Sequence, residues 1–530
     1  MSQYSGSSRG AEWHKWDLHV HTPASVEQQY GDAQQQQVWE DYVAALETLP
    51  PAIKVIGVND YFSIDGYRKV LAARERGRLK NLALVLPVVE LRLSSFAGHS
   101  DLSKLNFHVL FSDEVSPDTI EQFFLHRLSV EEHLSGNSPW RGCVGTEPGL
   151  IKLGEAVIAA TPKHKRTSES PLRVGFRSAA VPLSTICEAL DQTVFEGKYL
   201  TAIGVGEWSQ MRWEGAGAVQ KRDAIERADF VLTASASLAD YHTKLDKLRQ
   251  DEVNTRLIHA SDAHYFASSN EPNRLGQTYC WIKSDLTFRG LRRALARFSE
   301  RVFTGDLPEK LERVDRNKTK YIRSIEIRRK AGSLLEEVWF DTILPLNHDL
   351  VAVIGNQGSG KSALTDVIAL CGNSRVEEFS FLNTNKFCDR QRKAAEFHAA
   401  LTWEDGEITR CVLDERVNAS QVERVRYVPQ GFFEAVTNET AIDERGRFSA
   451  EIKKAIFSHV PTDDRLGCAT LDDLVTLHSR AAAAGLKELR RQLSDVNLQI
   501  VALEKACAPT EVERIAAQIE QKEAEIRSLE

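Results

Sequence analysis

The sequence lacks the features that mark secreted, disulfide-rich or membrane-spanning proteins. Its eight cysteines are scattered and form no CxxC pair, which argues against a zinc ribbon and against a disulfide scaffold. No segment approaches the roughly 18 uninterrupted apolar residues of a membrane span. The first 16 residues contain no apolar core of a signal peptide. We therefore expect a cytoplasmic protein without membrane contact.

An excess of positive charge is also missing. The chain has 67 Lys and Arg against 75 Asp and Glu, a net charge of −8, so any contact with nucleic acid must come from local patches. One such patch is the Lys-His-Lys-Arg run at 163–166, which could contact phosphates or form a solvated loop. Apolar residues make up 42% of the chain, as in folded proteins, and 530 residues are too many for a single core.

The first 300 residues alternate short apolar runs with helical segments. The runs are 53–58, 83–89, 107–111, 200–205, 230–234 and 257–260. This alternation predicts βαβ units and a mainly parallel sheet, while 112–198 is less regular and predicts long loops or an insertion. Acids and histidines follow several runs, namely Asp60, Glu90, Glu207, Asp262 and His264. Functional groups at the carboxyl ends of strands are the layout of a barrel-type α/β enzyme, here over residues 1–304.

The rest of the chain divides into three segments. Residues 305–320 are charged and without periodicity, so we expect a linker. A second α/β domain is predicted over 321–480, with strands near 322–328 and 350–354 and another ending at 427–428. From 481 to 530 we expect the start of a coiled coil. Its apolar seam is Leu486, Leu489, Leu493, Val496, Ile500 and Leu503, resumed after Pro509 by Val512, Ile515, Ile519, Ile526 and Leu529. The alternative is an amphipathic helix packed on its own domain.

A glycine-rich motif stands between a predicted strand and a predicted helix in the second domain. It matches GxxxxGK[ST] and consists of Gly355, Asn356, Gln357, Gly358, Ser359, Gly360, Lys361 and Ser362. Backbone N–H groups of such a loop converge on phosphates, aided by the positive end of the following helix. We expect Lys361 to reach the β- and γ-phosphates of ATP, and the Ser362 hydroxyl to bind Mg²⁺.

The segment LVAVIGNQGSGKSAL, followed by YVPQ, resembles the N-terminal half of an SMC-like ABC ATPase head. The resemblance implies that Gln430 senses the γ-phosphate, and that heads and coils form a homodimer. No apolar run ending in Asp-Glu follows the P-loop, and no LSGGQ-like signature is found. The chain thus looks like the N-terminal part of a longer ATPase. We expect it to bind ATP but to hydrolyse it poorly without the missing half or a partner.

Histidines and carboxylates provide a second set of candidates. The motif WDLHVHT places His19 and His21 on one face of a strand, where both can reach one metal ion. The other candidates end, or lie within, later apolar runs: Glu90, His108, Asp262 and His264. Such groups suit Zn²⁺, Mn²⁺ or Fe²⁺, which activate water and clamp phosphate oxygens. The alternative is that these histidines only satisfy hydrogen bonds in the core.

Over 17–264, these residues and their order resemble the PHP family (polymerase and histidinol phosphatase), a distorted βα barrel of metal-dependent phosphoesterases. The resemblance implies a first, catalytic centre and two further ones. The first holds His19, His21, Glu90 and Asp262, the second shares Glu90 and includes His108, the third includes His264, and Asp60 is a further ligand. The chain departs from the family where Tyr61 replaces the usual histidine. PASVEQ also lacks the expected ligand, and His164 is only a shifted substitute for another.

Residues 13–25 and the segment CWIKSDLTFRGLRRALARFSERV resemble the two ends of the PHP module in TrlF-type PHP–ATPase fusions. Two functions follow. In the first, a PHP phosphoesterase, more specifically a nuclease acting on DNA or RNA, is gated by the ATPase. In the second, a non-hydrolytic PHP module serves an ATP-driven clamp that binds nucleic acid. Matched ligands favour the first, and Tyr61 with the missing ligands favours the second.

Overall fold

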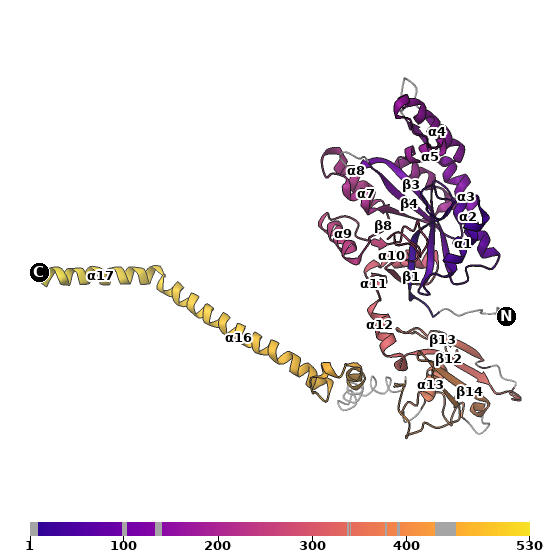
Figure 1. Ribbon diagram of the computed structural model, residues 1–530. Coiled ribbons are helices and arrows are strands. Elements are labelled where there is room, and N and C mark those ends of the chain that lie inside the picture. Colours follow the sequence, from indigo (N-terminus) through magenta and orange to yellow (C-terminus); the bar gives the residue numbers. More distant parts are fainter. Residues whose placement is uncertain are drawn as a thin grey trace. The chain divides into compact units, whose positions relative to one another are not determined.

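The computed structural model describes residues 9–97, 103–132, 140–335, 339, 341–376, 379–388, 393–429 and 452–529. The chain divides into two compact units. The first comprises 1–325, 343–352 and 402–408, and the second comprises 326–342, 353–401 and 409–530. Figure 1 follows the chain from the barrel of the first unit to the long C-terminal helices.

The first unit is built on a nine-stranded sheet of order β11-β10-β1-β2-β3-β4-β7-β8-β9. The strands are β1 Glu12–His21, β2 Ile53–Tyr61, β3 Leu84–Ala97, β4 Ser103–Phe111, β7 Tyr199–Gly204, β8 Phe230–Thr233, β9 Leu257–His259, β10 Cys280–Ser284 and β11 Val302–Thr304. Each predicted apolar run forms a strand. The prediction of a mainly parallel sheet was wrong. Strands β1-β2-β3 and β7-β8-β9 are parallel, but β4, β10 and β11 pair antiparallel with their neighbours.

The sheet curls into a nearly closed barrel. The segment after β9 returns to β1, where Ala263 forms a parallel bridge with Val20. The Ala263 carbonyl accepts the N–H of His21, and the Ala263 N–H donates to the carbonyl of His19. The fold is therefore mixed α/β with a barrel-like sheet, as the alternating pattern predicted.

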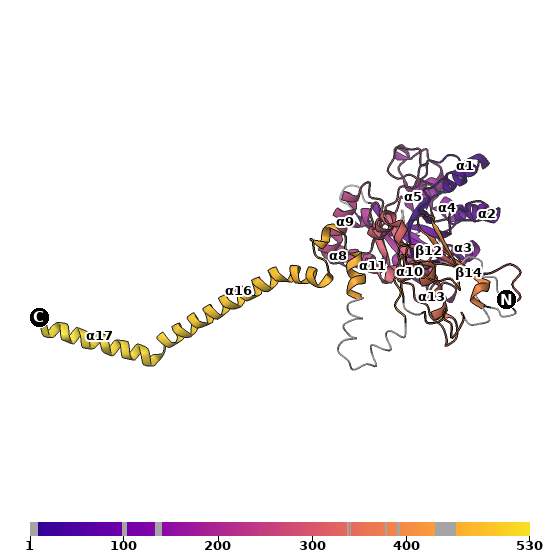
Figure 2. The ribbon, with the colours of Figure 1, turned by 90° about the horizontal axis from the view of Figure 1, so that it is seen from below.

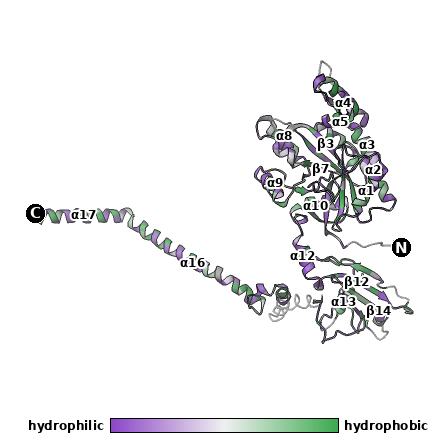
Figure 3. Cartoon of the chain, viewed as in Figure 1, coloured by the Kyte–Doolittle hydropathy of each residue, from purple (hydrophilic) through white to green (hydrophobic). Residues whose placement is uncertain are grey.

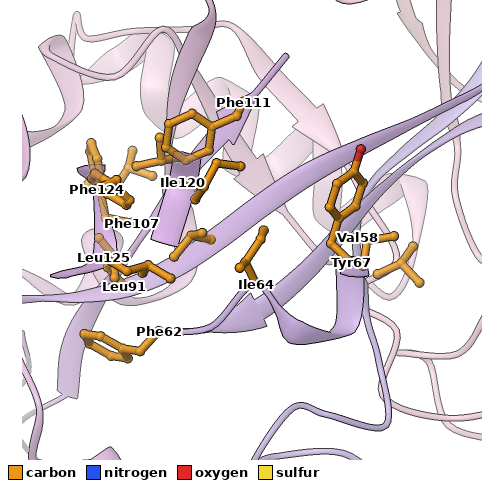
Figure 4. Packing of buried hydrophobic residues seen from close by; sticks show 14 of the residues in the cluster. Val58, Phe62, Ile64, Tyr67, Leu91, Phe107, Phe111, Ile120, Phe124 and Leu125 are labelled. Carbon is orange, nitrogen blue, oxygen red and sulfur yellow. The ribbon is translucent and has the colours of Figure 1, made fainter. Parts of the chain in front are cut away.

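Two apolar clusters lie on opposite faces of this sheet. The inner cluster takes one face of eight strands together with helix α10 (Phe288–Ala296); its members include Trp16, Leu86, Leu110, Phe230 and Ile282. The outer cluster packs the other face against helices. Figure 4 shows part of it, where Phe107 and Phe111 of β4 lie near Phe124, Ile120 and Leu125.

Helices cover the outside of the barrel. Figures 1 and 2 show α1 (Gln36–Glu47), α2 (Asp65–Glu75) and α3 (Pro117–Phe123) on one side, and α8 (Gly215–Glu226) and α9 (Leu238–Gln250) on the other. A short helix, α7 (Val205–Gln210), follows β7 directly. This arrangement leaves the strand ends, rather than the faces of the sheet, as the place for a site.

The segment 112–198 is more regular than its composition predicted. It forms α3, the hairpin β5 (Ser129–Glu132) and β6 (Trp140–Cys143), and helices α4 (Glu147–Ala160), α5 (Pro171–Ser178) and α6 (Leu183–Leu190). Helices α4 and α5 pack closely through Gly154 and Gly175. A Cβ at Gly154 would lie 1.8 Å from the carbonyl oxygen of Pro171. Gly154 and Gly175 thus lie in a close contact between two helices, where long loops were predicted. The basic run at 163–166 is exposed there.

The predicted linker also forms regular structure. Helix α12 spans Glu309–Arg316, buries Val314 and carries ion pairs one turn apart, Arg313 with Glu309 and Arg316 with Glu312. Charge pairs at this spacing stabilise the helix, which is too short for a periodic pattern of apolar residues to be recognised in the sequence. A four-stranded sheet of order β13-β12-β14-β15 follows. Its strands are β12 Ile322–Arg329, β13 Thr342–Pro345, β14 Phe397–Trp403 and β15 Ile408–Val412.

Two predicted strands are not formed in the described residues. Residues 350–354 are irregular, with Leu350 95% and Ile354 89% exposed. Residues 427–428 are irregular as well. An apolar run becomes a strand only where a neighbouring strand pairs with it, and the four-stranded sheet includes neither segment. A disulfide joins Cys371 to Cys411, which the cysteine spacing did not predict.

The C-terminal residues form two helices, α16 (Leu471–Ala506) and α17 (Pro509–Leu529). The break falls at the predicted change of phase, and the predicted seam is exposed along both helices; Figure 3 shows hydrophobic and hydrophilic residues alternating there. The coiled coil itself stays a prediction. Among the described residues, no helix is both long and apolar enough to cross a membrane.

Candidate functional site

A bulge in β1 directs two histidines into the mouth of the barrel. Trp16 and Leu18 belong to the inner cluster, but Val20 belongs to the outer one. The register between β1 and β2 shifts between Asp17 and Val20, which reverses the alternation at this point. A bulge of this kind re-aims the side chains that follow it. His19 and His21 therefore lie on the inner face, and both are buried.

Strands β3 and β4 supply a carboxylate and a third imidazole. Leu84, Leu86 and Val88 face the inner cluster, and Glu90 continues the same face at the end of the run. Across the antiparallel pair, Glu90 lies opposite His108. Both side chains are buried, Glu90 at 0% and His108 at 1% exposure.

Asp262 closes the site from the segment after β9. Its backbone has φ of +48°, the left-handed region that few residues other than glycine adopt. Flanking backbone bonds between Ala263 and β1 hold this conformation in place. Strained backbone of this kind is concentrated at functional sites, where the surrounding structure stabilises it. Here it brings the carboxylate of Asp262 to the histidines of β1.

The four groups of the predicted first centre converge on one point. The Nε2 atom of His19 lies 3.1 Å from Nε2 of His21, 3.2 Å from Oε2 of Glu90 and 3.1 Å from Oδ1 of Asp262. His21 Nε2 lies 3.4 Å and 3.3 Å from the same two oxygens.

Two overlapping groups of ligand atoms result, each with its atoms within 4.8 Å of one another. One is His19, His21 and Asp262, and the other is His19, Glu90 and His108.

Opposite charges shift the pKa values of these groups away from their ordinary range. Burial alone would lower the pKa of His19 and His21. The carboxylates of Asp262 and Glu90 outweigh it, raising the pKa of His19 and bringing that of His21 to about 10. Burial alone would raise the pKa of Glu90, but His108 and His19 hold it well below its usual range. The imidazoles of β1 thus hold positive charge where a bound cation would sit.

Several buried atoms lack a hydrogen-bond partner in the described part of the chain. Among them are Oδ1 of Asn59, Oε1 of Glu90 and both ring nitrogens of His108, whose Nε2 lies 3.5 Å from Oε2 of Glu90. Burial lowers the pKa of His108 despite the nearby carboxylate of Glu90, which favours a neutral ring with a lone pair. Buried polar groups are nearly always satisfied by hydrogen bonds or by an ion. Imidazole and carboxylate donors in this arrangement fit a divalent transition metal.

A surrounding layer of hydrogen bonds fixes the converging side chains. Asn59 donates to Oε2 of Glu90 at 2.7 Å and lies 3.3 Å from Nε2 of His21. On the other side of that ring, Nδ1 lies 3.1 Å from the hydroxyl of Ser25. The Tyr42 hydroxyl donates to the carbonyl of His21. Such contacts orient metal-ligating groups and set their tautomers. The sequence did not single out Asn59, because one amide beside an aspartate in a strand carries no distinctive signal.

The remaining predicted ligands are placed differently. Asp60 belongs to neither group of ligand atoms and accepts hydrogen bonds from the N–H and hydroxyl of Thr22. His264 packs its ring 4.1 Å from that of His21 and lies 2.7 Å from the carbonyl oxygen of Asp262. His164 is exposed in the 3-10 turn after α4. Asp60 thus supports Thr22, and its role as a ligand stays a prediction.

Tyr61, where the resemblance implied a histidine, stacks on His21. Its ring centroid lies 4.9 Å from that of His21, at an angle of 27°. Burial, together with the charges of Glu90 and Asp262, raises the pKa of its hydroxyl. Glu207 is a further titratable neighbour, since burial and the charges of Glu90 and Asp262 raise its pKa.

The P-loop of the second unit leads into helix α13 (Lys361–Cys371). Gly360 caps this helix with φ of +89°, and Gly358 has φ of +80°, conformations that favour glycine. Lys361 Nζ donates to the carbonyls of Gly355 and Asn356, each at 2.8 Å. Ser362 occupies the first turn of α13. Gln430 lies outside the described residues. Nucleotide binding therefore stays a prediction for this loop.

Comparisons with known proteins identify no family. No family model matches the sequence, and no curated protein matches it. Among solved structures, the chain is similar to an amidohydrolase from Chromobacterium violaceum, with 15% sequence identity and a TM-score of 0.25, covering 55% of this chain and 97% of that one. A TM-score this low carries no argument about function. The resemblance to PHP and SMC-like proteins stays a prediction.

Proposed function

We propose that the barrel is a metal-dependent hydrolase of phosphate esters. The observation that carries the proposal is the convergence of His19, His21, Glu90 and Asp262, with ligand atoms 3.1–3.4 Å apart; the first three side chains are buried and Asp262 is half-buried. Protonated imidazoles this close to each other repel, whereas one divalent ion would satisfy both rings and both carboxylates.

A second feature supports phosphate esters as the substrate class. Oε2 of Glu90 lies 3.4 Å from Nε2 of His21 and 3.5 Å from Nε2 of His108, so this carboxylate could bridge an ion at the first group and a second ion beside His108. Two ions so placed would activate a water molecule and stabilise the oxygens of a phosphoryl group during displacement. Asn59 holds Glu90, and Ser25 holds His21, so these ligands are oriented before any substrate arrives.

Metal content and hydrolysis, measured on the full chain, test the proposal together. Purified protein is analysed for bound metals, reloaded with Mn²⁺ or Zn²⁺, and assayed with bis-p-nitrophenyl phosphate and p-nitrophenyl phosphate. We expect bound metal and hydrolysis in the wild type, and loss of both in His21→Ala. His164→Ala, which changes an exposed histidine, is the matched control and should behave as wild type. Bound metal without hydrolysis of either ester would favour the non-hydrolytic alternative.

For the second unit we propose that the P-loop binds the triphosphate of ATP with Mg²⁺. Support comes from the left-handed conformations of Gly358 and Gly360, from the start of α13 at Lys361 and from the position of Ser362 in its first turn. Action on nucleic acid, and pairing of the exposed seam of α16 and α17 with a second copy, are further proposals. Binding of labelled single-stranded DNA and RNA tests the first, and light scattering of the purified chain tests the second.

A further inference from the structure

The β3–β4 hairpin extends the inner face of the barrel beyond the candidate ligands. Arg92 follows Glu90 by two residues on β3, so both side chains lie on the same face. Across the pair, Asn106 lies opposite Arg92, just as His108 lies opposite Glu90. The residue pair next to the candidate metal centre on this hairpin therefore consists of a cation, Arg92, and an amide, Asn106.

Arg92 is held by aromatic rings. Its guanidinium carbon lies 5.0 Å from the ring centroid of Tyr61 and 5.4 Å from that of Phe176. The same Tyr61 ring stacks on His21. A guanidinium fixed on aromatic faces keeps its charge and its hydrogen-bonding edge while losing little further freedom on binding. The ring of Tyr61 thus contacts both the guanidinium of Arg92 and the ring of the candidate ligand His21.

The charge of Arg92 is not neutralised within the described residues. No carboxylate there lies within ion-pair distance of it, and Nη1 donates a 3.5 Å hydrogen bond to the carbonyl of Phe176. Arginines elsewhere in the barrel are paired, such as Arg68 with Asp118 and Arg78 with Glu47. A guanidinium has five donors, and its planar edge matches two oxygens of one anion.

We infer that Arg92 binds the anionic phosphoryl oxygens of the substrate and that Tyr61 positions Arg92 for this task. The inference rests on the proposed phosphoesterase function and names a substrate-binding group for it. It also gives Tyr61 a role: the position that is a metal ligand in the family pattern becomes a platform for a cation.

Binding of inorganic phosphate tests the inference without relying on turnover. Because the P-loop is itself an expected phosphate site, the parent protein is the full chain with Lys361→Ala. Phosphate is titrated calorimetrically into the parent with its metal bound, and into Arg92→Gln and Arg92→Lys made in that parent. Loss of charge-assisted bonds should weaken phosphate binding about tenfold or more in Arg92→Gln and less in Arg92→Lys. Metal content should stay unchanged.

Arg227→Gln is the matched control, because Arg227 pairs with Asp223 one turn away on the surface. It should bind phosphate as the parent does. With p-nitrophenyl phosphate, Arg92→Gln should raise KM more than it lowers kcat, and Tyr61→Phe should keep most of the binding because the ring remains.

Unchanged phosphate affinity in Arg92→Gln with full metal content would overturn the inference alone. Loss of metal in Arg92→Gln and in Arg92→Lys would give Arg92 a structural role and overturn it too. A parent that binds neither metal nor phosphate would overturn both the inference and the proposed function.

Discussion

At the scale of single residues, the carboxylates inside the barrel divide into two kinds. Burial alone would raise the pKa of each of them. At Asp262, the charges of His19 and His21 outweigh burial and lower the pKa. No imidazole charge is strong enough to do this at Asp17 and Asp60, where burial raises the pKa to about 6 and about 7. The first kind suits a cation, and the second kind is structural.

A variant of Asp60 can therefore test whether this residue has a structural role or is a metal ligand. Its pKa is 3.8 in the unfolded chain and about 7 in the folded protein. Between these values the folded protein holds a proton that the unfolded chain has released, so the free energy of unfolding falls as pH rises through this window. In metal-free protein, the fall from pH 5 to pH 8 should be smaller in Asp60→Asn by roughly 3 kcal/mol, because about two pH units of this range lie below the folded pKa and each contributes about 1.4 kcal/mol.

Urea unfolding at the two pH values, with a chelator present, measures this difference. Asp246→Asn, a change at an exposed aspartate of α9, should leave the pH dependence as in wild type. Asp60→Asn should also retain its metal after reloading. Loss of the metal in Asp60→Asn, with a folded barrel, would return Asp60 to the ligand set.

At the scale of elements, the bulge in β1 depends on a close approach by β2. A Cβ at Gly57 would lie 2.5 Å from the carbonyl oxygen of Leu18, the residue just before His19. Gly57→Ala should therefore push β1 aside, destabilise the barrel by about 1–3 kcal/mol and weaken metal binding. Thermal unfolding and a Mn²⁺ titration measure the two effects. Gly206→Ala is the control, because nothing lies within 4 Å of a Cβ there. Equal metal affinity in Gly57→Ala and wild type would contradict this account of the bulge.

The same elements show what the sequence could and could not predict. Runs such as 53–58 and 107–111 became strands because they are buried between two apolar layers. Their direction was not predictable, since the run at 107–111 reads alike in a parallel or an antiparallel pair, and β4 is antiparallel to both neighbours. The run 350–354 is wholly apolar, but no strand of the described residues pairs with it, so it forms none.

The candidate site divides in the same way. His19, His21, Glu90, His108 and Asp262 could be found because each is an unusual residue within or just after an apolar run. Asn59 and Arg92 could not, because their importance comes from neighbours on other elements.

At the scale of the whole molecule, the candidate metal centre and the P-loop belong to different compact units. Their binding properties should therefore separate. Lys361→Ala should weaken ATP binding at least about tenfold, because this lysine is the main fixed charge at the β- and γ-phosphates, and should keep the metal. His21→Ala should lose the metal and keep ATP binding.

Fluorescent-nucleotide titration and elemental analysis of each variant measure the two properties. Lys386→Ala, at an exposed lysine that donates to the carbonyl of Ser380, is the control for the first variant. Equal ATP affinity in wild type and Lys361→Ala would contradict the P-loop assignment without affecting the proposed metal site of the barrel.

The central claim is that a divalent ion sits where His19, His21, Glu90 and Asp262 converge. Anomalous diffraction at the absorption edge of zinc or manganese, from crystals of the metal-loaded chain, tests it most directly. We predict an anomalous peak within bonding distance of Nε2 of His19 and Nε2 of His21, about 2.0–2.2 Å for Zn²⁺, and its absence in Asp262→Ala. No peak at these atoms in loaded wild-type crystals, with the four side chains ordered, would contradict the claim.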